Sequence, residues 1–166
     1  MNARADDSSG DFPSVLVIGY GNELRGDDGA GRKLAEMVES WGMEGVQTLS
    51  VRQLTPDLAA EMKGRTCVLF ADATEASEGN DDVRIRPLAV TETPTAGSHH
   101  CDPSELLALS AQLYGGAPDS FLLTIPGVNF AWSETLSTLG TTNLYVALAK
   151  ARKLMDSQTL HSGKLL

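Results

Sequence analysis

GYGNELRGDDGAG, residues 19–31, joins a short apolar run to a helical pattern. The run SVLVI at 14–18 is rich in β-branched residues and predicts a fully buried strand. After the turn, apolar residues recur at helical spacing and predict one buried helix face: Ala30, Leu34, Met37, Val38 and Trp41. A glycine-rich turn between a strand and a helix usually binds an anion. This turn carries two adjacent aspartates, Asp27 and Asp28, which would repel one.

The rest of the chain predicts strands alternating with helices. Further strands are expected at 46–51, 67–71, 82–90 and 121–125, and further helices at 55–64, 102–115 and 144–155. Only about ten polar residues separate the third and fourth strands, whereas a parallel crossover needs a dozen or more, so the fourth strand should be antiparallel to its neighbour. The pattern predicts an α/β three-layer sandwich, with a mostly parallel five-stranded sheet and helices on both faces.

Two of the predicted helices have recognisable starts. Thr55 is expected to cap the helix at 55–64, with Pro56 at its first position. Asp102 and Glu105 have the spacing of a capping box. We expect a single domain over residues 1–166, with its core at about 14–156 and polar tails, the second from about Ser157.

Composition limits the function classes. The net charge of −9 argues against nucleic acid and anionic membranes as partners. No apolar run approaches the ~18 residues of a membrane span, and MNARADDSSGDF at 1–12 has no apolar stretch of the signal-peptide kind. The two cysteines give no disulfide framework, and Cys67 is expected to be a buried thiol. These features favour a cytoplasmic protein.

Phosphate-binding motifs fit the turn poorly. Gly19 and Gly21 match a dinucleotide fingerprint, but Leu24 stands at its third position and no acid follows the second strand. The chain has no Walker Gly-Lys-Ser/Thr sequence and no G-x-S-x-G nucleophile elbow.

A cation suits the acidic turn better. Asp28 near the first helix, Asp72 after the third strand, and His99 or His100 in a loop are expected at the carboxyl edge of the sheet, where α/β proteins bind ligands. Two carboxylates and an imidazole leave open positions and suit zinc, nickel or similar ions. Structural roles are also possible, because Asp27 could cap the helix, Asp72 could form an Asx turn and a loop histidine could be merely solvated.

The motifs together resemble the nickel–iron hydrogenase maturation endopeptidases. The resemblance begins with VLVIGYGNELRGDDGAG and continues through RQLTPDLAAEM, VLFADATEASEG, SHHCDPSELLALSAQLYG and FLLTIPGVNFAWSETLS. It covers roughly residues 14 to 150, in order and at family-like spacing. The family fold is an α/β sandwich around a five-stranded sheet, in agreement with the elements predicted above.

The resemblance implies an aspartyl-type endopeptidase that acts late in hydrogenase assembly. Such enzymes bind the nickel-loaded precursor of the large subunit and cut off its C-terminal extension. The family's nickel contacts fall on Asp28, Asp72 and His99, which are therefore the expected metal-binding and catalytic residues. The nickel is carried by the substrate, although the isolated protein could bind another divalent ion. A monomer is expected.

Two questions stay open at this point. No Ser, Cys or Thr is evidently paired with an activating base. A metal could assist hydrolysis, or nickel could serve only in recognition while another group does the chemistry. The alternative function is a non-catalytic metal- or nucleotide-binding α/β module.

Overall fold

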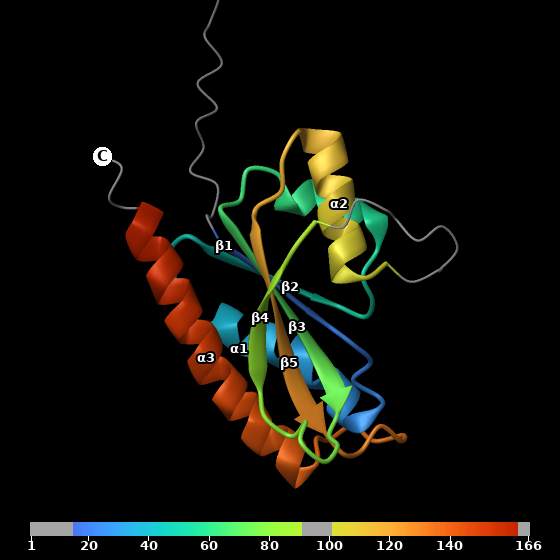
Figure 1. The fold of residues 1–166 in the computed structure, drawn as a ribbon. Helices are drawn as coiled ribbons and strands as arrows, with labels where there is room; N and C mark the ends of the chain where they lie inside the picture. The colour runs from blue at the N-terminus through green and yellow to red at the C-terminus, as the bar shows by residue number, and fades with distance from the viewer. Residues whose placement is uncertain (1–14, 91–100, 163–166) are drawn as a thin grey trace, which may run out of the picture.

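A five-stranded sheet forms the centre of the molecule (Figure 1). The computed structural model describes residues 15–90 and 101–162. The strands lie in the order β2-β1-β3-β5-β4. Their bounds are β1 Val15–Tyr20, β2 Val46–Val51, β3 Cys67–Glu75, β4 Arg84–Leu88 and β5 Asp119–Gly127. All neighbouring pairs are parallel except β4 with β5, which is antiparallel.

Helices cover both faces of this sheet, as the sequence predicted. Helices α1 (Ala30–Ser40) and α3 (Thr138–Ser162) pack on one face, while α2 (Pro103–Tyr114) and the 3-10 helix η2 (Pro56–Met62) pack on the other. A short 3-10 helix, η1 (Gly26–Gly29), leads into α1. Within the described residues, no helix has the length and apolar character needed to cross a lipid bilayer.

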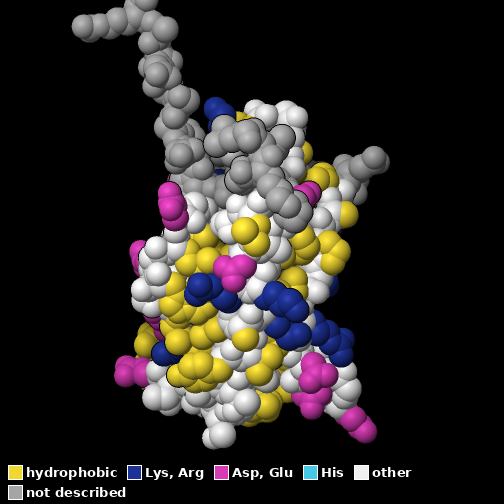
Figure 2. All heavy atoms as spheres, turned by 90° about the vertical axis from the view of Figure 1, so that its left-hand side faces the viewer, with side chains coloured by type: hydrophobic (Ala, Val, Ile, Leu, Met, Phe, Trp, Pro, Cys, Tyr) yellow, Lys and Arg dark blue, Asp and Glu magenta, His cyan; other side chains and the backbone are white. Residues whose placement is uncertain are grey.

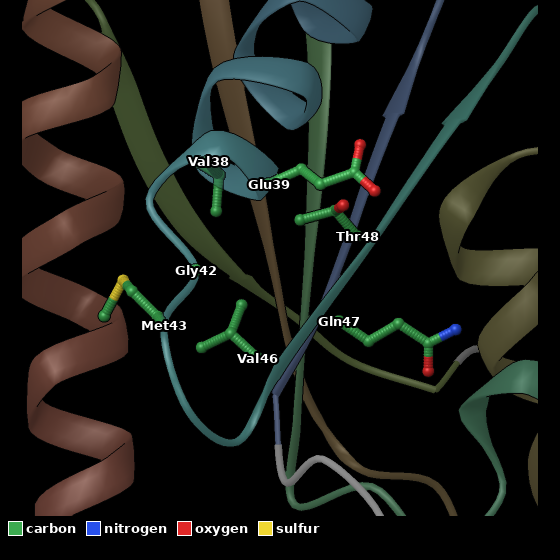
Figure 3. Close-up of a pocket in the computed structure, with 7 residues that line it drawn as sticks. All are labelled: Val38, Glu39, Gly42, Met43, Val46, Gln47 and Thr48. Atoms are coloured by element: carbon green, nitrogen blue, oxygen red, sulfur yellow. The ribbon is translucent and has the colours of Figure 1, made fainter.

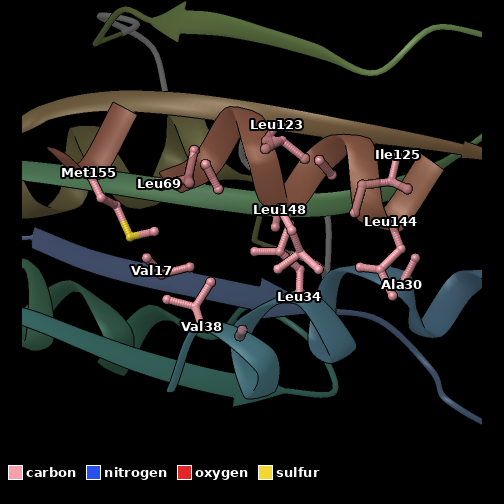
Figure 4. Packing of buried hydrophobic residues seen from close by; sticks show 14 of the residues in the cluster. Val17, Ala30, Leu34, Val38, Leu69, Leu123, Ile125, Leu144, Leu148 and Met155 are labelled. Carbon is pink, nitrogen blue, oxygen red and sulfur yellow. The ribbon is translucent and has the colours of Figure 1, made fainter. Parts of the chain in front are cut away.

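The larger of two cores lies between the sheet and the α1–α3 layer (Figure 4). Leu34 and Val38 of α1 and Leu148 of α3 meet Val17 and Leu69 of the central strands, and all five are buried. The second core lies under α2 and η2 and includes Leu16, Phe70 and Leu106. Strands that are buried on both faces read as continuous apolar runs, which is why the sequence located them well.

The predicted reversal of β4 is confirmed, and the structure adds the reason it is possible. Strand β5 lies between β3 and β4, so the short 76–83 connection need only reach the edge of the sheet. The capping box is also confirmed, because Asp102 accepts from the Glu105 N–H at 2.8 Å and Glu105 accepts from the Asp102 N–H at 3.0 Å.

Two local predictions are wrong. The segment after Thr55 is a 3-10 helix, and the Thr55 side chain makes no capping hydrogen bond. Helix α3 continues to Ser162, beyond the tail expected from Ser157. The Ser157 and Thr159 hydroxyls donate to helix carbonyls, so these polar residues remain helical.

Gly31 allows α1 to start against the sheet. A Cβ at this position would lie 2.2 Å from the carbonyl oxygen of Ala71 in β3 and 2.8 Å from that of Tyr20 in β1. Both obstacles are backbone atoms of central strands, which cannot move away cheaply. The glycine therefore sets the distance between α1 and the two strands that carry the site described below.

We expect Gly31→Ala to lower the free energy of unfolding by about 3 kcal/mol, because α1 must move off the sheet. Gly116→Ala is the matched control, since a Cβ there meets nothing within 4 Å, and it should stay within about 0.5 kcal/mol of wild type. Urea unfolding measures both. Equal stability of the two variants would show that α1 does not depend on this close approach.

Candidate functional site

Asp27 is fully buried, and its carboxylate accepts four hydrogen bonds from a distant loop. Oδ2 accepts from the N–H groups of Val128 (2.8 Å) and Asn129 (3.0 Å) and from the Ser137 hydroxyl (2.6 Å). Oδ1 accepts from the Ser137 N–H at 2.7 Å. The idea that Asp27 caps a helix is therefore wrong, because its carboxylate organises the loop between β5 and α3.

The surroundings of Asp27 keep it charged. Burial alone would raise its pKa, but the hydrogen bonds from Ser137, Asn129 and Val128 outweigh this, and the pKa lies below its ordinary value. Two glycines leave room for the side chain. A Cβ on Gly127 would lie 2.4 Å from the Asp27 Cβ, and one on Gly140 would lie 2.1 Å from Oδ1.

Backbone hydrogen bonds join the same loop to the glycine-rich turn at residues 19–31. The Gly26 N–H donates to the Ser133 carbonyl at 2.8 Å, and the Ser133 N–H donates to the Leu24 carbonyl at 3.0 Å. The Asp27 N–H donates to the Asn129 carbonyl at 2.8 Å. Segments 24–27 and 127–137 thus form one hydrogen-bonded unit at the carboxyl edge of the sheet.

Asp28 has a different environment from its neighbour. It is only half-buried, and its carboxylate accepts a hydrogen bond from the Asn22 N–H at 2.9 Å. It does not cap α1, because the N-cap is Gly29 and no side chain bonds there. Asn22 braces the turn, since its side-chain oxygen accepts from the Leu24 N–H at 3.1 Å. Within the described residues, the other oxygen of the Asp28 carboxylate is therefore available to bind a metal ion.

Asp72 lies inside β3, which continues to Glu75, so it is not the Asx-turn residue that could follow a strand. Its carboxylate is hydrogen-bonded to the side chain of Tyr20, the neighbouring position on β1. Burial raises the pKa of Asp72 to about 6, and the Asp28 charge adds to the rise, while the bonds from Tyr20 and the Ala73 backbone oppose it. The electrostatic link places the two carboxylates near each other.

Both carboxylates line one open depression of about 330 Å³ at the carboxyl ends of β1, β2 and β3. Asp28 and Asp72 are joined there by Tyr20, Arg52 and Cys101, none of which the sequence singled out for this site. Burial, followed by the charges of the neighbouring acids, raises the pKa of the Cys101 thiol, so Cys101 is not a ready thiolate ligand.

His99 and His100 lie outside the described residues. Cys101, the first described residue after them, does line the depression. Within residues 15–90 and 101–162, no group of three or more His, Cys, Asp and Glu side chains is placed to hold a metal ion. The structure therefore brings together two of the three predicted ligands, Asp28 and Asp72.

Another depression, of about 360 Å³, lies between the end of α1 and the start of β2 (Figure 3). Its lining includes Val38, Met43 and Val46, with Glu39 as the one ionisable side chain. It lies at the amino end of β2, away from the edge where α/β sheets bind ligands. Because it offers no second reactive group, we regard the acidic depression as the candidate site.

Several solved structures similar to this chain are described as hydrogenase maturation proteases. The hydrogenase maturating endopeptidase HybD from E. coli superposes with a TM-score of 0.70 at 19% identity, covering 86% of this chain and 92% of that one. The nickel–iron hydrogenase maturation protease HybD from Thermococcus kodakarensis gives 0.67 at 23% identity, covering 85% and 98%. HycI from the same organism gives 0.63 at 17%, covering 89% and 93%.

This chain has the hydrogenase maturation protease fold. No family model matches the sequence, and no curated protein matches it significantly. The conserved feature is therefore the architecture, which extends over nearly the whole length of the HybD structures.

Asp27→Asn should lower the free energy of unfolding by about 3 kcal/mol at pH 7, because an amide cannot accept all four hydrogen bonds and one NH₂ would face donors. Asp28→Asn, the same change one residue later, should cost less than about 1 kcal/mol. Chemical denaturation compares the two. If both variants unfold alike, the buried carboxylate does not hold the loop.

Asp72 should make stability depend on pH between about 4 and 6. Its folded pKa of about 6 lies above the ordinary 3.8, so the folded state binds the extra proton in this window and stability falls as the pH rises through it. Asp72→Asn should remove this loss. Compared with wild type, its free energy of unfolding should be about 1–2 kcal/mol higher at pH 7 than at pH 4, a range that allows for the partial exposure of Asp72. Parallel pH profiles for the two metal-free proteins would contradict the raised pKa.

Proposed function

We propose that this protein is an endopeptidase of nickel–iron hydrogenase maturation, which recognises nickel in the large-subunit precursor and removes the C-terminal extension of that precursor. The observation that carries the proposal is the pair of carboxylates, Asp28 and Asp72, at an open depression on a fold shared with hydrogenase maturation proteases. An acidic, accessible edge suits a metal-bearing substrate and disfavours a phosphate ligand.

The donors at this depression fit a borderline divalent ion. Asp28 and Asp72 supply oxygen ligands, and neither is engaged in an ion pair within the described residues. His99 would supply the imidazole, and it is separated by one residue from Cys101, which lines the depression. Three ligands leave positions open, as required if the ion stays bound to the precursor. The isolated protein would bind such an ion weakly.

The two carboxylates would have different tasks in cleavage. Asp28, held by the Asn22 N–H, would bind and orient the metal-bearing end of the precursor. Asp72, whose carboxylate is held by a hydrogen bond to Tyr20, would also accept the proton that the attacking water releases. Nickel bound in the substrate would supply charge stabilisation for the attacked carbonyl. We propose that the protein acts as a cytoplasmic monomer.

The direct test mixes the purified protein with nickel-loaded and nickel-free precursor and follows the mass of the large subunit. We expect cleavage of the loaded form alone, reduced about 100-fold or more in Asp72→Asn because the proton acceptor is lost. Glu23→Gln, on the same loop but paired with Arg32 away from the depression, should cleave normally. His99→Ala should abolish cleavage, and His100→Ala should leave most of it.

Equal cleavage of both precursor forms would rule out recognition through nickel. Binding of a divalent ion without any cleavage would favour the non-catalytic metal-binding module instead.

A further inference from the structure

A third depression, of about 500 Å³, lies along the edge strand β4 and carries three cationic side chains. Arg84 and Arg86 come from β4, and Lys150 comes from α3. Thr74 of β3 and Thr124 of β5 also line it. We call this depression the cationic groove. The maturation reaction as proposed above assigns it no task.

Among the described residues, the cations of the groove have no acidic ion-pair partner. Within the described residues, ion pairs join Arg32 with Glu23 and Arg152 with Asp156, and none involves Arg84, Arg86 or Lys150. One Arg84 nitrogen donates to the Gly79 carbonyl at 3.0 Å. Lys and Arg side chains gather across the middle of the face shown in Figure 2. Three cations without an ion pair in the described part of the chain are notable in a protein whose net charge is −9.

Strand register connects the cationic groove to the acidic site. Asp72 on β3 pairs with Thr124 on β5, and Thr124 pairs with Arg84 on β4, so the three residues share one face of the sheet. Neighbouring strands are ~4.8 Å apart, which places the Arg84 backbone about 10 Å from that of Asp72. Arg86 acts electrostatically on Tyr20, which itself lines the acidic depression.

These distances match a short peptide. An extended chain advances ~3.3 Å per residue, so a bound peptide that runs from Asp72 to Arg84 would use about three residues for this distance. Arginine guanidinium groups bind carboxylates through paired hydrogen bonds, which gives such a groove a preference for acidic segments.

We infer that the cationic groove binds carboxylate groups of the substrate's C-terminal extension, about three residues beyond the cleaved bond. The inference rests on the proposed endopeptidase function, because it assigns the groove to the leaving segment. It predicts that acidic residues in the extension, or its terminal carboxylate, strengthen substrate binding. Neutral extensions would be cleaved with a higher KM.

Fluorescence anisotropy tests the groove without catalysis. The probes are two labelled peptides of equal length, one with glutamates at alternate positions and one with glutamines in their place. The glutamate peptide should bind wild type, and Arg84→Gln/Arg86→Gln should weaken this binding about tenfold, as expected for the loss of two exposed charge contacts. Lys33→Gln/Lys153→Gln removes the same charge outside the groove and should bind like wild type.

Equal binding of the two peptides, or equal loss of binding in the two double variants, would overturn the inference. The precursor assay separates this failure from failure of the proposed function. If wild type cleaves nickel-loaded precursor with the same KM as Arg84→Gln/Arg86→Gln, the function stands and the groove assignment is wrong. If no precursor is cleaved but the glutamate peptide binds selectively, the groove binds acidic peptides, and both the function and the assignment of the groove to the leaving segment are wrong.

Discussion

The buried carboxylate of Asp27 is the interaction on which the carboxyl edge of this protein depends. A charged group without solvent is costly unless it is fully hydrogen-bonded, and here four donors from the 128–137 loop satisfy it. The same bonds satisfy loop N–H groups that would otherwise need water. Gly127 and Gly140 are required because any side chain there would occupy the space of the carboxylate. The loop and the glycine-rich turn at residues 19–31 therefore form together.

This arrangement explains why a glycine-rich turn carries two aspartates. Asp27 turns inward and builds the edge, while Asp28 remains half-buried beside an open depression. Neighbouring residues of identical chemistry thus take a structural and a proposed functional role. The second carboxylate of the depression, Asp72, comes from the adjacent part of β3, and its raised pKa reflects both burial and the nearby Asp28. The glycines that usually admit a phosphate here admit close backbone contacts instead.

The sequence predicted the central strands β1, β3 and β5 because they are largely buried and read as apolar runs. It also predicted the reversed β4, since the connection at 76–83 is too short for a crossover. The role of Asp27 could not be predicted, because its partners lie 101 to 110 positions later and three of its four bonds come from backbone N–H groups, which no side-chain pattern reveals. Asp28 and Asp72 were found as candidates, but Tyr20 and Arg52 were not, because strand pairing and loop position alone bring them to the site.

Residue-resolved hydrogen exchange of the native protein tests the central claim most directly. If the Asp27 carboxylate holds the loop, the N–H groups of Val128, Asn129 and Ser137 should exchange as slowly as those of Leu123 and Ile125 in β5, although Val128 itself is exposed. Exposed residues without this bonding, such as Trp132, should exchange much faster. Exchange of the Val128, Asn129 and Ser137 N–H groups at the Trp132 rate would contradict the account.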